Sequence, residues 1–97
     1  MAKGYWVSVY RAISDPERLT AYDQLARSAV QAAGGRVLSR GGRVVAHEAG
    51  NTQRVVLIEF DSFEQAVAAY ESEAYEKALL ALSDGVERDF RIIEGID

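Results

Sequence analysis

The run Val55-Val56-Leu57-Ile58 limits the possible folds of this chain more than any other feature. It lies in the segment Gln53 to Phe60, whose composition is typical of a β-strand. A strand that is apolar on both faces is expected to be covered on both sides of its sheet. The chain has 97 residues, the usual length of one domain. Its own helices can cover one side of the sheet, so the other side needs a further cover.

Two helical regions and further strands are predicted around this central strand. The predicted elements are a strand from Tyr5 to Arg11, a helix begun by Asp15-Pro16 and ended by Gly34-Gly35, a helix begun by Ser62, a helical segment begun by Ser72 and ended by Asp84-Gly85, and a last strand from Glu87 to Glu94. Apolar residues recur at three- and four-residue steps in each helix. Gln65, three residues after Ser62, predicts a capping box.

The stretch between the first helix and the central strand has two interpretations. Arg36 to Arg40 and Arg43 to Glu48 are both strand-like and are separated by Gly41-Gly42. The glycine pair could form a tight hairpin turn between two strands. It could also form a bulge that bends one long strand. We favour the bent strand because it leaves an even βαββαβ order.

This order predicts one α+β domain over residues 1–97, with a ferredoxin-like βαββαβ plan. Four antiparallel strands would form the sheet, and the helices would cover one face. Water is a poor cover for the other face, since the central strand is apolar on both sides. A second copy of the sheet is the simplest cover, so we expect a homodimer that pairs through its sheet faces as a dimeric α/β barrel.

Composition excludes several classes of function. The formal net charge is −4, which argues against nucleic acid as a partner because phosphate binding needs a concentrated basic surface. The chain has no cysteine, so disulfides, thiolate catalysis and cysteine-bound zinc are excluded. No apolar run approaches the roughly 20 residues of a membrane span. The first residues run into a strand pattern without a signal segment, so the expected compartment is the cytoplasm.

The sequence resembles the family known as domain of unknown function 1330. The matching pieces are Gly4-Tyr5-Trp6, Asp15-Pro16-Glu17, Tyr22, Gly34-Gly35-Arg36, Arg40-Gly41-Gly42, Glu48, Gly50, Arg54 to Phe60, Tyr70-Glu71-Ser72, Tyr75 and Ile93-Glu94-Gly95. They span nearly the whole chain in the family's order. The resemblance implies a ferredoxin-like fold paired into a dimeric α/β barrel. The related superfamily includes cofactor-independent monooxygenases of quinol-type substrates, haem-degrading enzymes and lactone isomerases. Leu82 departs from the pattern, because an arginine often lies near this position in the family.

Glu59 and His47 are the candidates for a catalytic role. Glu59 follows the apolar run of the central strand, so its carboxylate must reach solvent or find a donor such as Arg40, Arg54 or Tyr22. If it is buried, desolvation favours its neutral form and makes it a candidate proton acceptor. The alternative is a structural ion pair. His47 is the single histidine and could act as an acid or base, or it could be an ordinary solvent-facing strand residue.

Further polar and aromatic residues are candidates for lining a pocket. Trp6, Ser8 and Tyr10 share one face of the first strand, and Tyr5, Val7 and Val9 share the other. We expect the more apolar set, Tyr5, Val7 and Val9, to pack on the helices. The set with Trp6 would then line the barrel, although aromatic residues of this kind are also common in a core. Tyr22 and Arg40 complete the group of pocket candidates.

These observations support a homodimeric domain that binds a small molecule, with no metal and no built-in cofactor. Neither a phosphate-binding glycine motif nor a serine or zinc hydrolase motif is present. One alternative is a cofactor-independent monooxygenase or isomerase acting on a small aromatic or lactone-like substrate, in which Glu59 or His47 moves a proton. The other alternative is a purely structural dimer. An enclosed pocket that contains these residues with Tyr10 or Tyr22 would favour the enzyme.

Overall fold

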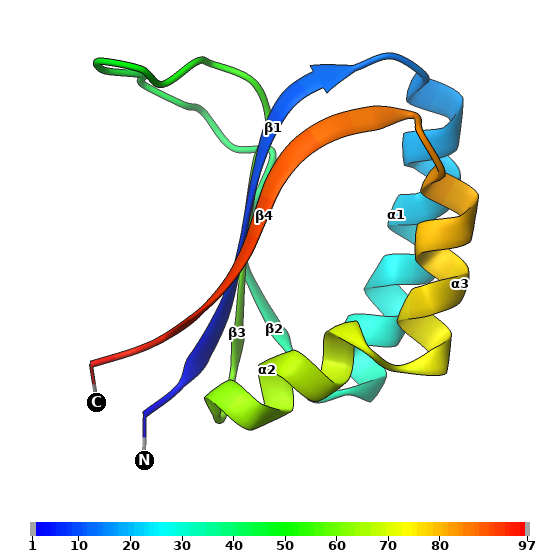
Figure 1. Cartoon of the computed structure of the whole chain (residues 1–97), viewed down its shortest axis with the longest axis vertical. Helices are drawn as coiled ribbons and strands as arrows, with labels where there is room; N and C mark the ends of the chain where they lie inside the picture. The colour runs from blue at the N-terminus through cyan, green and yellow to red at the C-terminus, as the bar shows by residue number, and fades with distance from the viewer. Residues whose placement is uncertain (1, 97) are drawn as a thin grey trace.

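Four antiparallel strands form one sheet, and three helices cover one of its faces (Figure 1). The computed structural model describes residues 2–96. Its elements are β1 (Gly4–Ile13), α1 (Pro16–Ala32), β2 (Arg36–Arg40), β3 (Val55–Phe60), α2 (Phe63–Tyr70), α3 (Glu73–Leu82) and β4 (Val86–Glu94). The strand order is β2-β3-β1-β4, and every neighbouring pair is antiparallel. The predicted ferredoxin-like α+β plan is therefore confirmed.

The predicted caps begin the three helices. The side chain of Asp15 accepts a hydrogen bond from the backbone N–H of Arg18, and Pro16 is the first residue of α1. Ser62 and Ser72 begin α2 and α3 in the same way. The capping box is only half formed, because the Gln65 side chain donates instead to the backbone oxygen of Ala33, at 2.8 Å. Gln65 thus ties α2 to the end of α1.

The prediction of a bent strand through Gly41-Gly42 is wrong. Strand β2 ends at Arg40, and residues 41–54 form a loop that projects from the sheet (Figure 1). The N–H of Gly41, which has a φ of +69°, donates to the backbone oxygen of Val55, the first residue of β3. Beyond this bond β3 offers no further residue for pairing, so the strand-like sequence after Gly42 stays unpaired. The register shifts instead inside β2, around Leu38.

The two faces of β1 are the reverse of the expectation. Trp6, Ser8 and Tyr10 are buried beneath the helices, at 2%, 2% and 0% exposure. The indole Nε1 of Trp6 donates to the backbone oxygen of Ala66 in α2, at 2.8 Å. The polar atoms of these side chains therefore have partners inside the layer, and hydropathy alone does not identify the inner face. The alternation predicted for the strand is retained.

The opposite face of the sheet carries the apolar residues that the sequence predicted to pack on the helices. Strand pairing places Tyr5, Val7 and Val9 of β1 beside Val55, Leu57 and Glu59 of β3, and beside Asp89, Arg91 and Ile93 of β4. The centre of this outer face is apolar, and Ile93 is 57% exposed. Within residues 2–96, no helix has the length and apolarity that a membrane crossing requires.

Candidate functional site

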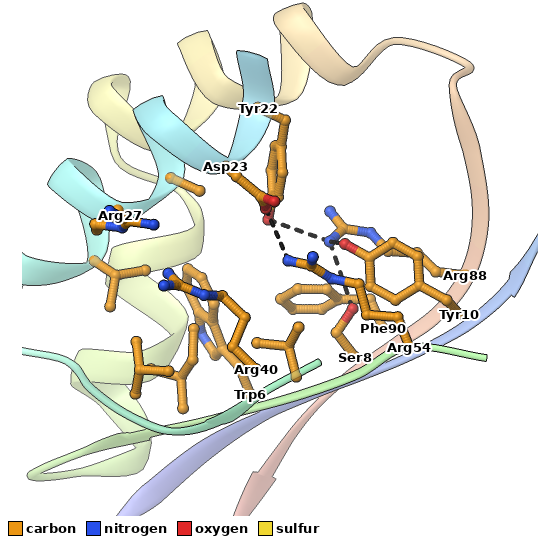
Figure 2. A pocket seen from close by; sticks show the side chains of 15 residues that line it. Trp6, Ser8, Tyr10, Tyr22, Asp23, Arg27, Arg40, Arg54, Arg88 and Phe90 are labelled. Carbon is orange, nitrogen blue, oxygen red and sulfur yellow. Dashed lines mark hydrogen bonds and ion pairs between the residues drawn. The ribbon is translucent and has the colours of Figure 1, made fainter. Parts of the chain in front are cut away.

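A cavity lies between α1 and the inner face of the sheet (Figure 2). Its free volume is about 30 Å³, enough for one or two water molecules. The residues that line it are Trp6, Ser8, Tyr10, Tyr22, Asp23, Ala26, Arg27, Val30, Val37, Arg40, Arg54, Val56, Ile58, Arg88 and Phe90. Seven of these fifteen are apolar, so the wall combines an apolar surface with a small number of charged groups.

Arg88 of β4 lines the cavity and donates hydrogen bonds to four hydroxyl groups. Its Nη1 donates to the hydroxyl groups of Ser8, Tyr10 and Tyr22, at 3.4, 3.4 and 3.2 Å. Its Nη2 donates to the hydroxyl of Tyr75 at 3.2 Å, and the hydroxyls of Tyr75 and Tyr22 share a hydrogen bond. One guanidinium group therefore joins β1, β4, α1 and α3 through hydroxyl groups.

Aromatic rings surround the same guanidinium. Its central carbon lies 4.9 Å from the ring centre of Phe90, 5.0 Å from that of Tyr22 and 5.7 Å from that of Tyr10. Such contacts stabilise a cation electrostatically. Burial acts to lower the pKa of Arg88, but the oxygens of Tyr22 and Tyr75 outweigh this effect and the pKa is raised. Arg88 is thus positively charged inside the domain.

Burial has the opposite effect on the phenol groups beside the arginine, because their charged form is the deprotonated one. Burial raises the pKa of Tyr75, and it also raises the pKa of Tyr10 against the lowering effect of Arg88. Both phenols are therefore neutral at physiological pH. They can donate or accept a hydrogen bond, but they do not neutralise the charge of Arg88.

A second arginine, Arg54, is the last residue of the loop before β3, and its side chain enters the cavity (Figure 2). Its Nη2 donates to the Oδ1 of Asp23 in α1, at 2.8 Å, and its guanidinium lies 5.4 Å from the ring centre of Tyr10. Its Nε is buried and has no hydrogen-bond partner within residues 2–96. A buried donor without a partner is uncommon in proteins, so this atom needs an acceptor that the described residues do not supply.

Two more arginines complete the charged lining. Arg40, at the end of β2, and Arg27, on α1, line the cavity and are exposed to solvent. The four arginine charges face the single aspartate charge of Asp23, which leaves three positive charges in excess. The excess is notable because the whole chain has a formal charge of −4.

The structure brings all five pocket candidates together around this cavity. Trp6, Ser8, Tyr10, Tyr22 and Arg40 line it, although it lies on the helix side of the sheet and not inside the expected barrel. Sequence reasoning missed further residues of the site, which are Arg54, Arg88, Asp23 and Tyr75. Alternation along the last strand carried a usable signal, since Arg88, Phe90 and Ile92 are spaced to share one face.

Glu59 lies on the outer face of the sheet and does not line the cavity. Its carboxylate accepts hydrogen bonds from Arg36 Nε, at 2.9 Å, and from the Tyr5 hydroxyl, at 3.3 Å. The expected donors Arg40, Arg54 and Tyr22 were wrong, because these three face the helices and Glu59 faces the other way.

His47 does not line the cavity either. It is exposed in the loop after β2, where its backbone oxygen accepts from the N–H of Gly50. The sequence interpretation placed it in a strand, which is wrong. Leu82 is buried at the end of α3 and is not part of the lining. Among residues 2–96, no group of three histidine and carboxylate side chains is arranged to hold a metal ion.

Comparisons with known proteins identify the family and the fold. The family model described as "Domain of unknown function (DUF1330)" matches residues 3–96. No curated protein matches this sequence. A protein of unknown function from Rhodopseudomonas palustris, RPA0582, shares 18% identity at a TM-score of 0.72, over 96% of this chain and 80% of that chain.

Two further solved structures are similar in fold. One is a candidate antibiotic biosynthesis monooxygenase from Nitrosomonas europaea, with 17% identity and a TM-score of 0.56 over 98% of this chain and 90% of that chain. The other is described as a dimeric ferredoxin-like protein of unknown function from Thermobifida fusca, with 14% identity and a TM-score of 0.53 over 96% and 89%. At these identities the likeness shows the fold alone.

Proposed function

The chain belongs to the DUF1330 family, and we propose that it is a homodimeric protein that binds a small molecule in the cavity between α1 and the sheet. The observation that carries the proposal is the buried Nε of Arg54, which lacks a partner within residues 2–96 and belongs to a residue of the cavity wall. A ligand with a hydrogen-bond acceptor would satisfy this atom. The apolar wall around it suits the body of a small organic molecule.

Trp6 allows a direct test of binding. It is the only tryptophan of the chain and it lines the cavity, so its fluorescence should change when a ligand enters. We would titrate the protein with benzyl alcohol, benzamide and benzoate as small aromatic probes. We expect at least one of them to shift or quench the emission with saturation.

A pair of alanine variants provides the control. Ala26 is buried and lines the cavity, so Ala26→Leu should fill the space and remove the response. Ala21 is exposed on the same helix, so Ala21→Leu should leave it unchanged. If no probe gives a saturable change in the unmodified protein, or if Ala26→Leu and Ala21→Leu behave alike, binding in this cavity is contradicted.

The outer face of the sheet supports the homodimer. Val7, Leu57 and Val9 lie at its centre and are only partly shielded within one chain. Apolar side chains in such a patch gain about 25 cal/mol for each Å² that a partner removes from water. The Thermobifida fusca protein of similar fold is described as dimeric. A second copy of the same face would cover the patch.

A charge on this face should separate the subunits. Leu57→Glu would place a carboxylate in the centre of the proposed interface, and we expect sedimentation analysis at micromolar concentration to show a monomer. Leu80, which is 72% exposed on α3, provides the control, and Leu80→Glu should remain dimeric. A monomeric unmodified protein would rule out the dimer.

An enzyme of the monooxygenase or isomerase type, acting on a small aromatic or lactone-like substrate without a cofactor, is the second candidate. The Nitrosomonas europaea protein supports it through its fold, and Asp23 supports it as the carboxylate of the cavity that could accept a proton. Oxygen consumption with 1,4-dihydroxynaphthalene as probe would test the monooxygenase, with Asp23→Asn expected to lower the rate.

Glu59→Gln and His47→Ala test the residues that the sequence first suggested. Neither lines the cavity, so both variants should consume oxygen at the unmodified rate. If the unmodified protein consumes oxygen no faster than the probe does without protein, the monooxygenase is contradicted.

A dimer that shows neither binding nor turnover would favour a purely structural role.

A further inference from the structure

The charge of Arg88 has no counter-ion within the part of the chain that the structure describes. Among residues 2–96, the ion pairs of the chain involve Arg11, Arg18, Arg36, Arg54 and Arg91, and none involves Arg88. Its partners are neutral hydroxyl groups. Arg88 is partly buried, and a charge that is taken out of water is normally paired because its desolvation is costly. The unpaired guanidinium is therefore a position at which an anion would be stabilised.

The hydrogen bonds of Arg88 leave room for a stronger acceptor. They measure 3.2 to 3.4 Å, whereas N–H···O bonds in proteins are most often about 2.9 to 3.0 Å long. Bonds from an arginine to an ionised oxygen are shorter and about twice as strong as those between neutral groups. An oxyanion would compete well for these N–H groups.

The other residues of the lining also favour an anion in the cavity. The Nε of Arg54 has no hydrogen-bond partner among the described residues, and the lining carries three positive charges in excess. The apolar part of the wall includes Trp6, Phe90 and Ile58, which give flat and aliphatic surfaces beside the charged groups. Figure 2 shows Arg54 between the ring of Tyr10 and the side chain of Arg40, at the centre of the cavity.

We infer that the cavity takes a small organic carboxylate with an apolar, ring-sized body. The carboxylate lies within reach of Arg88 and Arg54, and the body packs against Phe90 and Trp6. The free volume of about 30 Å³ is too small for a ring, so entry displaces the exposed side chains of Arg40 and Arg27 at the rim. This inference rests on the proposed function and specifies the ligand class of the same site.

Benzoate and benzamide test the charge preference, because they have nearly the same shape and differ in charge. With Trp6 emission as the readout, we expect benzoate to bind about tenfold or more tightly, as one hydrogen bond to a charged group would give. Inorganic phosphate at the same concentration should not displace it, since it lacks the apolar body. This comparison needs only the unmodified protein.

Variants of two arginines on one strand locate the preference. Arg88→Met should reduce benzoate affinity to that of benzamide, and Arg88→Lys should retain part of the preference because it keeps the charge without the planar fork. Arg91 lies on the same strand but on the outer face, 75% exposed at its side chain, and Arg91→Met should bind benzoate normally.

The possible outcomes separate this inference from the proposed function. Equal affinity for benzoate and benzamide would overturn the carboxylate preference and leave binding in the cavity standing. Displacement of benzoate by phosphate would overturn the requirement for an apolar body. Binding of benzyl alcohol or benzamide without benzoate would overturn the charge assignment. A lack of binding by every probe would overturn both.

Discussion

Arg88 of β4 and Tyr22 of α1 meet across the cavity, with Nη1 3.2 Å from the hydroxyl oxygen and the guanidinium carbon 5.0 Å from the centre of the ring. The two residues come from an edge strand of the sheet and from the helix that covers it. Their contact combines a hydrogen bond with a cation–π interaction. It connects the stability of the domain with the chemistry of the proposed site.

Arg88→Met should change the free energy of unfolding by no more than about 1 kcal/mol. The substitution loses hydrogen bonds to hydroxyl groups, but it also removes a partly buried charge that has no counter-ion among residues 2–96, and the two effects oppose each other. Urea unfolding followed by Trp6 fluorescence measures the change. A loss of 3 kcal/mol or more, on the scale of breaking a buried ion pair, would show that Arg88 is mainly structural.

Tyr22→Phe and Tyr75→Phe should each destabilise the domain by about 1 kcal/mol, because each removes hydroxyl hydrogen bonds in a buried network. The two hydroxyls bond each other, so the double variant should lose less than the sum of the single losses. A double-mutant cycle by urea unfolding gives this coupling. Strict additivity would contradict a shared network.

The free energy of unfolding should fall as the pH rises above about 10. Burial raises the pKa of Tyr10 and Tyr75 in the folded protein, whereas both titrate near 10 when unfolded. The unfolded state therefore loses protons first. The stability that these groups provide is complete below pH 10 and is lost as the pH rises toward the folded pKa.

Urea unfolding at about pH 9 and pH 11 checks this dependence, and Tyr10→Phe is the matched variant. Phenylalanine does not titrate, so the variant should lose less stability between the two pH values than the unmodified protein. The ultraviolet absorbance of the buried phenolates should appear together with unfolding. Its appearance well before unfolding would contradict the raised pKa values.

Gly4→Ala should destabilise the domain by about 1 to 3 kcal/mol. A Cβ atom at Gly4 would lie 2.5 Å from the backbone oxygen of Ser62 and 2.7 Å from the Cα of Phe63, so β1 and the start of α2 would have to separate. Gly42→Ala is the control, since its nearest neighbour would be the Ser39 hydroxyl at 3.6 Å. Thermal unfolding compares the two, and equal melting temperatures would contradict the tight approach at Gly4.

The number and type of the elements could be predicted from the sequence because their signals are local. Asp15, Ser62 and Ser72 begin helices through hydrogen bonds to N–H groups three residues further along. The apolar run of β3 identified the central part of the sheet. Each of these signals acts over a few residues and does not depend on the rest of the fold.

The loop of residues 41–54, after β2, could not be predicted in the same way. The sequence around Val45 is strand-like, yet this residue is 82% exposed in the loop. Strand pairing needs a partner, and β3 begins at Val55, which leaves none for the residues beyond Gly41. The extent of a strand at a sheet edge is thus decided by its neighbour.

The sequence by itself determined the ferredoxin-like order and the central position of the Val55 to Ile58 strand. Only the tertiary structure decided which face of β1 meets the helices, and with it that Arg88 and Arg54 join Tyr10 while Glu59 faces away. The physical reason is that alternation along a strand fixes which side chains share a face, but not which face is inside. Partners far away in the sequence decide that, as the backbone oxygen of Ala66 does when it accepts a hydrogen bond from Trp6.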